Sequence, residues 1–250
     1  MKYNIIILTI ISLAACTSES KDSADRTTKK TRTKDTTSLQ DILNEKKYGF
    51  NTQADSIKKQ VYAEGIQAVI DANITTNALQ VGSKAPDFML KNAAGSRVSL
   101  YDELENGPVI LMWYRGGWCP YCNLTLRAME DMLPQFRAGG AQLLALTPES
   151  PDNSMTTIEK HKLSFEVLTD NDNAVAKAYG VVFQLTEEVK AYYENGFGLS
   201  AYNGNDKGEL PLGATYVIGT DGFITYAFLD ADYRNRAEPL EVLNALTRTK

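Results

Sequence analysis

The chain has 250 residues, of which 43% are hydrophobic and 23% are charged, so it is long enough for one sizeable domain with appended segments. Its net charge of −5 gives no reason to expect a nucleic-acid partner. It contains three cysteines and one histidine, so few donors are available for a zinc site, which takes about four ligands.

The first 16 residues have the pattern of a targeting signal. Lys2 gives a short positive start, residues 5–15 form an apolar run too short to span a bilayer, and small residues precede Cys16. The Leu-Ala-Ala-Cys sequence ending at Cys16 resembles a bacterial lipobox. The resemblance implies a lipoprotein of the bacterial cell envelope, anchored to a membrane through lipidated Cys16, with its domain on the extracytoplasmic side. An ordinary secretory signal cut beside Ala15 is the alternative.

Two segments separate this signal from the main domain. Residues 17–37 are almost entirely Ser, Thr, Lys, Arg, Asp and Glu, so we expect a disordered tether. A helical period begins at Ser38, breaks at 48–50 and resumes over 52–72. Residues 38–80 are therefore predicted to form a helical extension that packs on the main domain. A helix that binds a partner protein is the alternative.

The main domain is predicted over residues 81–250. Segments 85–88 and 98–100 flank an Ala-Ala-Gly turn, which indicates a hairpin. The run 109–114 is short, apolar and aromatic, as in a strand buried on both faces. Apolar residues then recur at helical spacing, so we expect a helix over 119–136 that ends at Gly139.

The same alternation of strands and helices continues to the end of the chain. We expect a strand over 142–146, a helix over 151–162 capped by Ser150, an edge strand over 165–168, a helix over 174–179, a hairpin over 215–228 and a helix over 240–246. Residues 181–212 form a long polar excursion, helical over 187–193, that we expect to shape the site entrance. This order favours a mixed, three-layer α/β domain.

Two cysteines, Cys119 and Cys122, lie at the predicted strand-to-helix turn. Free N–H groups and the dipole at a helix N-terminus lower a thiol pKa from its free value of about 8.5. Cys119 is therefore the expected nucleophile. Cys122, one turn later, can attack what forms on the first sulfur and close a disulfide, and Pro120 suits the first helical turn. A zinc half-site with His161 and a pair of inert structural thiols are the alternatives.

The string from Tyr114 to Leu124, with Trp-Cys-Pro-Tyr-Cys at its centre, resembles the peroxiredoxin-like branch of the alkyl hydroperoxide reductase/thiol-specific antioxidant (AhpC/TSA) superfamily. The similarity extends from residues 81–88 to the Arg-Ala-Glu-Pro sequence at 236–239. It implies a thioredoxin-like fold with a mixed central sheet. It also implies a peroxidase, without cofactor or metal, that reduces hydrogen peroxide or organic hydroperoxides through a sulfenic acid and an intramolecular disulfide. A thioredoxin-like dithiol protein would recycle it.

The chain departs from this family pattern near the cysteines. Gly116 stands where peroxiredoxins usually have Thr or Ser, and Cys122 replaces their usual acidic residue. Thioredoxin-like reductases have a cis-proline before the Thr-containing strand, where this chain has Gly213 and Ala214. A thiol–disulfide oxidoreductase acting on envelope proteins therefore stays open as the alternative activity, and a non-enzymatic redox sensor is a third possibility.

Neighbours of the cysteines are expected to support them. Arg115 is placed to hold the thiolate or polarise a peroxide, although a solvated charge at the strand end is the equal alternative. Trp118 is expected to shield the sulfur, and Tyr121 to tune access of substrate or partner. Arg127 and His161 are expected on helix surfaces without a direct role.

Overall fold

The computed structural model describes residues 38–248. The predicted signal segment with Cys16 and the predicted tether over 17–37 lie outside the described residues, so both stay predictions. Within residues 38–248, no helix combines the length and the apolar character needed to cross a membrane.

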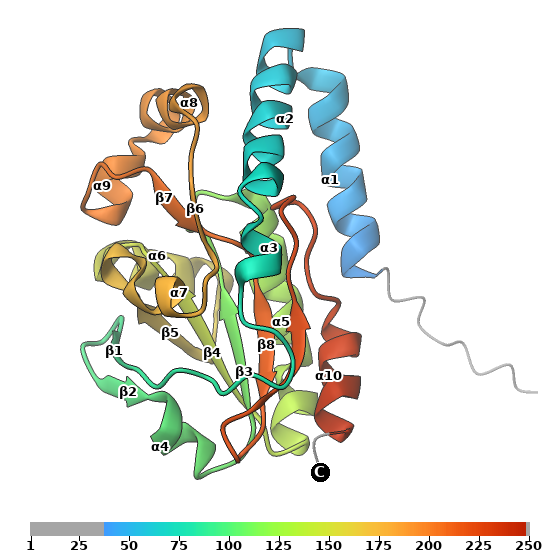
Figure 1. Cartoon of the computed structure of the whole chain (residues 1–250), viewed down its shortest axis with the longest axis vertical. Helices are drawn as coiled ribbons and strands as arrows, with labels where there is room; N and C mark the ends of the chain where they lie inside the picture. Colours follow the sequence, from blue (N-terminus) through green and yellow to red (C-terminus); the bar gives the residue numbers. More distant parts are fainter. Residues whose placement is uncertain (1–37, 249–250) are drawn as a thin grey trace, which may run out of the picture. The chain divides into compact units, whose positions relative to one another are not determined.

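A seven-stranded mixed sheet forms the centre of the domain, in the order β2-β1-β5-β4-β3-β8-β9 (Figure 1). Its strands are β1 (Met89–Asn92), β2 (Arg97–Ser99), β3 (Val109–Trp113), β4 (Gln142–Thr147), β5 (Glu166–Thr169), β8 (Thr215–Ile218) and β9 (Ile224–Phe228). Strands β3, β4 and β5 are parallel, and the outer strands pair antiparallel to their neighbours. A separate ribbon pairs β6 (Val182–Gln184) with β7 (Glu209–Pro211).

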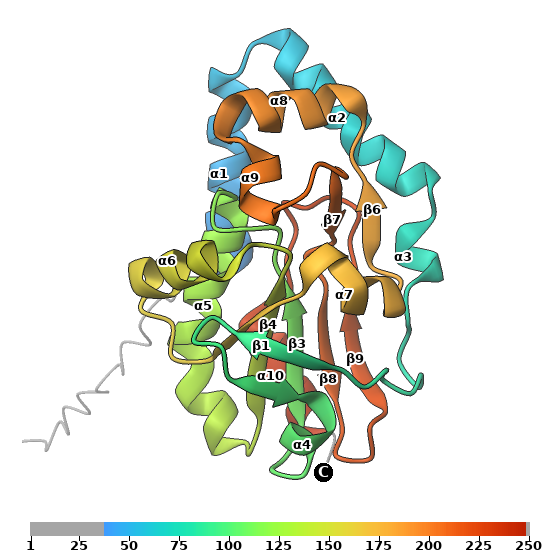
Figure 2. The ribbon, with the colours of Figure 1, turned by 90° about the vertical axis from the view of Figure 1, so that its left-hand side faces the viewer.

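Helices cover both faces of the sheet and complete a three-layer α/β fold (Figure 2). One face packs against α1 (Leu39–Gln53), α5 (Pro120–Ala138), α6 (Pro151–His161) and α10 (Pro239–Thr247). The other carries α2 (Ser56–Asp71), α4 (Leu100–Leu104), α7 (Ala174–Ala178), α8 (Glu187–Phe197) and α9 (Leu199–Asn203); α3 (Ile74–Asn77) and a 3-10 turn (Asn171–Asn173) are connectors.

Strand β3 lies inside the sheet and separates two hydrophobic cores. All five of its residues are buried, as expected for a strand covered on both faces. Ile110 and Met112 face α5, whereas Leu111 and Trp113 face the opposite layer. Because side chains alternate along a strand, this buried run fixes the place of the turn that follows it.

The helical extension differs from its predicted boundaries. Helix α1 runs through residues 48–50, where a break was predicted. A single glycine inside a helix costs only about 1 kcal/mol, so Gly49 does not end it. The chain instead breaks at Ala54 and Asp55, whose side chain accepts from the N–H of Lys58 to cap α2. Leu43 of α1 is fully buried in the core beside α5.

Three local predictions were wrong. The first hairpin begins at Met89 instead of residue 85, because residues 85–88 form no ladder. Strand β5 is not an edge strand, since that hairpin adds β1 to its outer side. Ser150 does precede α6, but its side chain makes no cap hydrogen bond to the backbone and instead accepts from Asn153.

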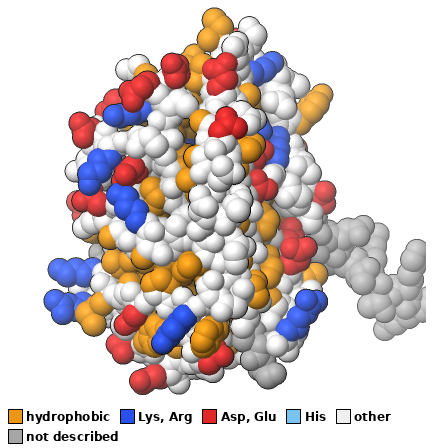
Figure 3. Space-filling view, viewed as in Figure 1, with side chains coloured by type: hydrophobic (Ala, Val, Ile, Leu, Met, Phe, Trp, Pro, Cys, Tyr) orange, Lys and Arg blue, Asp and Glu red, His pale blue; other side chains and the backbone are white. Residues whose placement is uncertain are grey.

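Acidic and basic side chains are interspersed over the face shown in Figure 3. Hydrophobic side chains show mainly in the lower half of that face. Mixing of the two signs keeps this surface free of a strong field of one sign.

Candidate functional site

The cysteines lie where the sequence predicts them, at the turn from β3 into α5. Cys119 is the N-cap residue of α5, Pro120 occupies the first helical turn, and Cys122 lies within that turn. Both cysteines are free thiols, and the exposed fractions of Cys119 and Cys122 are 1% and 0%. The reactive pair is therefore enclosed by protein.

Arg115 places its own positive charge beside this pair. Its side chain is only 1% exposed, so it is not a solvated charge at the strand end. One guanidinium nitrogen, Nη1, lies 4.0 Å from Cys119 Sγ, and Nη2 donates to the Tyr193 hydroxyl at 2.6 Å. The backbone N–H of Arg115 donates to Cys122 Sγ at 3.4 Å. One residue thus contacts both sulfurs.

A second buried cation, Arg236, contacts the other sulfur. Its Nη2 lies 3.5 Å from Cys122 Sγ, and its Nη1 donates to the Asn235 carbonyl at 2.7 Å. A Cβ at Gly213 would lie 2.6 Å from the Arg236 Cζ. The glycine therefore makes room for this guanidinium, because any side chain at position 213 would meet it.

The two thiols share their protons unequally in this geometry. The predicted lowering of the Cys119 thiol pKa at the helix N-terminus is not found, because burial raises this pKa and the neighbouring Cys122 raises it further. Burial also opposes charge on Cys122, but the hydrogen bond with Cys119 and the nearby Arg236 and Arg115 outweigh it and lower the pKa of Cys122 well below its usual range. The pair therefore holds one proton and one negative charge.

Aromatic side chains from distant segments close the site. Trp118 stacks on Phe197 of α8 with ring centroids 4.5 Å apart and lies 5.1 Å from Tyr193. The Arg115 guanidinium lies over the rings of Trp118, Tyr193 and Tyr233 at 4.9, 5.3 and 4.1 Å. Helix α8 belongs to the excursion over 181–212, which was predicted to shape the site entrance and which places Tyr193 and Phe197 beside Arg115 and Trp118.

Gly116 is required by the position of Trp118. Its φ of +152° favours glycine, and a Cβ there would lie 2.2 Å from Trp118 Nε1. A Thr or Ser at this position would collide with the indole that lies against the Arg115 guanidinium. The departure from the family pattern is thus coupled to the aromatic cover.

A buried carboxyl group lies beneath the same turn. Glu149, just after β4, is 0% exposed, and its Oε1 accepts from the Gly117 N–H at 2.8 Å. Among the described residues no partner reaches its Oε2, the Tyr114 hydroxyl or the Ser154 hydroxyl. Burial raises the pKa of Glu149 to about 7, against the hydrogen bond from Gly117, and Cys122 raises it further.

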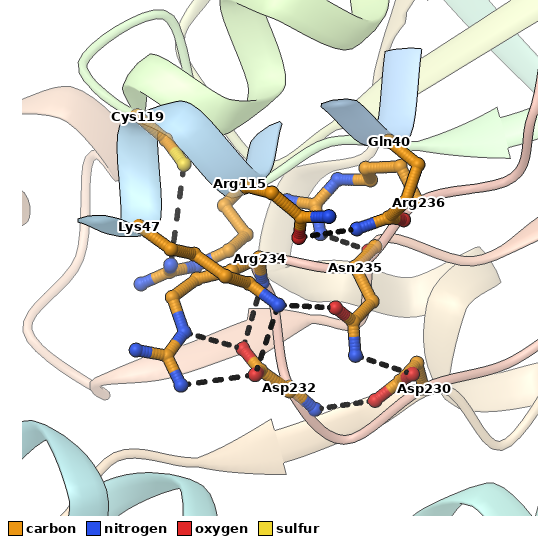
Figure 4. A network of polar contacts seen from close by, with 10 residues as sticks. Gln40, Lys47, Arg115, Cys119, Asp230, Asp232, Arg234, Asn235 and Arg236 are labelled. Atoms are coloured by element: carbon orange, nitrogen blue, oxygen red, sulfur yellow. Dashed lines mark hydrogen bonds and ion pairs between the residues drawn. The ribbon is translucent and has the colours of Figure 1, made fainter. Parts of the chain in front are cut away.

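The segment before α10 carries two of the site residues, Tyr233 and Arg236, and α1 holds it in place (Figure 4). Lys47 Nζ donates to Asn235 Oδ1 at 2.5 Å and lies 3.7 Å from Asp232. Asp232 in turn accepts from Arg234. At the start of α1, the N–H groups of residues 39 and 40 donate to the Glu238 carboxylate. The helical extension is therefore joined to the site.

The structure places the other candidates as follows. Tyr121 is buried and its ring lies 5.7 Å from that of Tyr233, whereas Pro120 is exposed beside the pair. Arg127 is exposed on α5. His161 ends α6. Within residues 38–248 no group of three His, Cys, Asp or Glu side chains is arranged to hold a metal ion.

Four residues of the site were missed by the sequence reasoning: Glu149, Tyr193, Tyr233 and Arg236. Only Arg236 carried a signal, because it stands in a sequence used for the family resemblance. The others reach the pair through loops and through α8, whose placement depends on tertiary packing.

Curated relatives include a chloroplastic peroxiredoxin Q from Oryza sativa subsp. japonica, 26% identical over 166 residues, which cover 66% of this chain and 64% of the relative. A thiol-disulfide oxidoreductase ResA from Bacillus cereus is 26% identical over 105 residues, which cover 42% of this chain and 60% of the relative. The chain thus spans less than two thirds of the length of either relative.

Solved structures show the same fold. Peroxidoxin BcpB from Mycobacterium tuberculosis matches with a TM-score of 0.55 at 19% identity, covering 69% of this chain and 99% of that one. Peroxiredoxin Q from Xanthomonas campestris matches with a TM-score of 0.52 at 18% identity, covering 68% and 96%. The thioredoxin-like peroxiredoxin fold predicted from the sequence is therefore confirmed.

The model of the AhpC/TSA family matches residues 81–227, which is more than half of the chain and includes both cysteines. This match agrees with the peroxiredoxin-like resemblance of the cysteine turn and with the fold. The chain therefore belongs to the AhpC/TSA family.

Proposed function

We propose that the protein is a thiol peroxidase that reduces hydrogen peroxide or organic hydroperoxides with Cys119 and Cys122. The observation that carries this proposal is the pair of buried arginines on the two sulfurs, Arg115 on Cys119 and Arg236 on Cys122. Fixed cations at a thiol pair stabilise a thiolate before reaction and the charge that develops on the leaving oxygen during it. Family membership and the similarity to peroxiredoxin Q support the same activity.

In the proposed reaction the Cys119 sulfur attacks a peroxide oxygen, the O–O bond breaks, and Cys119 becomes a sulfenic acid. The Cys122 thiolate then attacks the Cys119 sulfur, a disulfide forms, and water leaves. The proton of the pair can pass from Cys119 to Cys122, because the two thiols are hydrogen-bonded neighbours. Cys119 can therefore carry the negative charge when it attacks the peroxide, and Cys122 can carry it when it attacks the Cys119 sulfur.

Thiol–disulfide exchange with envelope proteins is the second candidate. The Cys-Pro-Tyr-Cys turn at a helix N-terminus and the similarity to ResA favour it. Burial disfavours it, because a protein disulfide must reach a Cys119 residue that is only 1% exposed. A peroxide is small enough to demand less opening.

We further propose that a thioredoxin-like dithiol protein recycles the disulfide. Such a reductant meets the same aromatic cover, so recycling requires Trp118 and α8 to move apart in the oxidised protein. The anion on Cys122 disappears when the disulfide forms, and with it one attraction that draws Arg236 inward.

An extracytoplasmic location, with a membrane anchor at lipidated Cys16, is also part of the proposal and rests on the lipobox pattern alone. Metabolic labelling of producing cells with a fatty-acid analogue tests it. Label is expected on the native chain and absent from Cys16→Ser; equal labelling of both would contradict the anchor.

A coupled assay tests the catalytic proposal, with peroxide consumption followed in the presence of dithiothreitol or a thioredoxin system. Cys119→Ser should abolish turnover. Cys122→Ser should retain one oxidation of Cys119 and lose recycling by the thioredoxin system. Full turnover by the Cys119→Ser variant would overturn the assignment of the nucleophile.

A further inference from the structure

The site contains a fourth ionisable group whose role the peroxidase chemistry leaves open. Glu149 is fully buried, and its Oε1 is bonded to Gly117, two residues before Cys119. Its Oε2 has no hydrogen-bond partner among residues 38–248, and neither do the nearby buried hydroxyls of Tyr114 and Ser154. A buried carboxylate without full pairing is costly, so a neutral, protonated form is favoured while an anion lies close by.

That nearby anion is the Cys122 thiolate. Two titratable groups act on Glu149: Cys122 of α5 raises its pKa, whereas the side chain of Tyr114, just after β3, lowers it. Helix α6 contributes only the uncharged Ser154 to this cluster of unpartnered groups. Two anions at this depth repel each other, and burial and that repulsion together raise the pKa of Glu149 to about 7.

Disulfide formation removes the thiolate but leaves both buried cations. Arg115 and Arg236 contact the sulfurs in the reduced protein and stay charged at all accessible pH values. With the thiolate gone and Glu149 neutral, the two guanidinium groups would have no anion at the pair. Loss of the thiolate also removes the repulsion that opposes a charge on Glu149, so oxidation favours ionisation of Glu149.

We infer that proton binding at Glu149 is coupled to the redox state of the cysteine pair. Glu149 holds a proton while the pair is reduced and releases that proton when the disulfide forms. This inference concerns the disulfide itself and uses the proposed peroxidase function only for the identity of the oxidant. It keeps the net charge of the buried site constant through the reaction.

Protons and electrons balance in this scheme. Reduction of a hydroperoxide to an alcohol and water takes two electrons and two protons. Cys119 attacks, the S–O bond forms, the O–O bond breaks, and the leaving oxygen takes the proton of the cysteine pair. Cys122 then attacks, the S–S bond forms, the S–O bond breaks, and the hydroxide that leaves becomes water with the proton from Glu149. A dithiol reductant returns two electrons and two protons.

The test needs no peroxide. The midpoint potential of the Cys119–Cys122 couple is measured in dithiothreitol redox buffers across neutral pH, and its pH dependence gives the number of protons taken up per disulfide reduced. Below pH 7, where Glu149 is protonated in the reduced protein, two protons are expected for the wild type, one for Glu149→Gln, and two again for Glu149→Asp. Glu159→Gln, on the exposed surface of α6, serves as the matched control and should behave as wild type.

Infrared difference spectra of the wild-type protein give a second readout, which does not depend on whether the variants fold. The reduced protein should show a carbonyl band of a protonated carboxyl group that disappears on oxidation. An unchanged carboxyl band, or the same proton number in wild type and Glu149→Gln, would overturn the inference. Absence of peroxidase activity would leave both results standing and would instead count against the proposed function.

Discussion

At the scale of single residues, the site combines two thiols, two buried arginines and one buried acid in a small volume. Arg115 is the centre of this group, because it contacts Cys119, Cys122 and Tyr193 at once. Its planar guanidinium can bond Tyr193 with one nitrogen and face Cys119 with another. A lysine ammonium has no second arm of this kind.

Arg115→Lys should therefore slow oxidation of the pair by about 10²-fold, the usual cost of losing one group that stabilises developing charge. The second-order rate constant with hydrogen peroxide is the quantity to measure. Arg127→Lys, on the exposed surface of α5, is the control and should keep the wild-type rate. Equal rates for the two variants would show that Arg115 does not stabilise the charge that develops during oxidation.

The raised pKa of Glu149 should also make the stability of the reduced protein depend on pH. Its pKa rises from 4.5 to about 7 on folding. Its contribution to stability is therefore fully present below pH 4.5 and is lost as the pH rises through 7, by about 3 kcal/mol in total. Urea unfolding at pH 4.5 and pH 8 should show this loss in the wild type relative to Glu149→Gln. A constant difference between the two proteins at both pH values would contradict it.

At the scale of elements, the site depends on two segments that the strand-helix turn does not contain. Helix α8 supplies Tyr193 and Phe197, and the segment before α10 supplies Tyr233 and Arg236. Helix α1 fixes the second segment through Lys47 (Figure 4). An element outside the matched family region thus holds the segment whose Arg236 contacts Cys122 and whose Tyr233 lies against the Arg115 guanidinium.

Lys47→Met should loosen this segment and lower the rate of oxidation roughly tenfold, because small displacements of a positioned group cost rate steeply. Amide hydrogen exchange over residues 231–236 should become faster at the same time. Lys46→Met replaces the exposed neighbouring lysine on the same helix and should change neither quantity. Unchanged exchange in Lys47→Met would mean that the segment is held by other contacts.

The sequence predicted the elements that carry a strong periodic signal. Strand β3, helix α5 and the position of the cysteines between them follow from a buried apolar run and a change of period. The sequence pattern predicted neither the pairing of β1 with β5 nor the packing of α8 on Trp118. They depend on contacts between residues far apart in the chain, such as Trp118 with Phe197. Glu149 was likewise invisible, because nothing local marks a glutamate as buried.

At the scale of the whole described domain, the N-terminal helices and the family core fold together. Leu43 is fully buried beside α5, and Val69 of α2 lies in the opposite core. The extension is thereby part of both hydrophobic cores. A free helix awaiting a partner would leave such side chains exposed.

Leu43→Ala should lower the free energy of unfolding by about 2–5 kcal/mol, since it opens a cavity in the core. Ile42→Ala, whose side chain is 36% exposed on the same helix, should change it by only about 0.5 kcal/mol. Urea unfolding followed by tryptophan fluorescence measures both. Similar small effects for the two variants would mean that α1 is not part of the core.

The central claim is that this buried pair reacts first with a peroxide, and single-turnover kinetics test it most directly. The reduced protein is mixed rapidly with hydrogen peroxide while tryptophan fluorescence is followed, and the same sample is used in an insulin-reduction assay. Fast oxidation that yields the Cys119–Cys122 disulfide, with little insulin reduction, is the predicted result. Slow oxidation together with brisk insulin reduction would contradict the account and identify a disulfide reductase built on a peroxiredoxin fold.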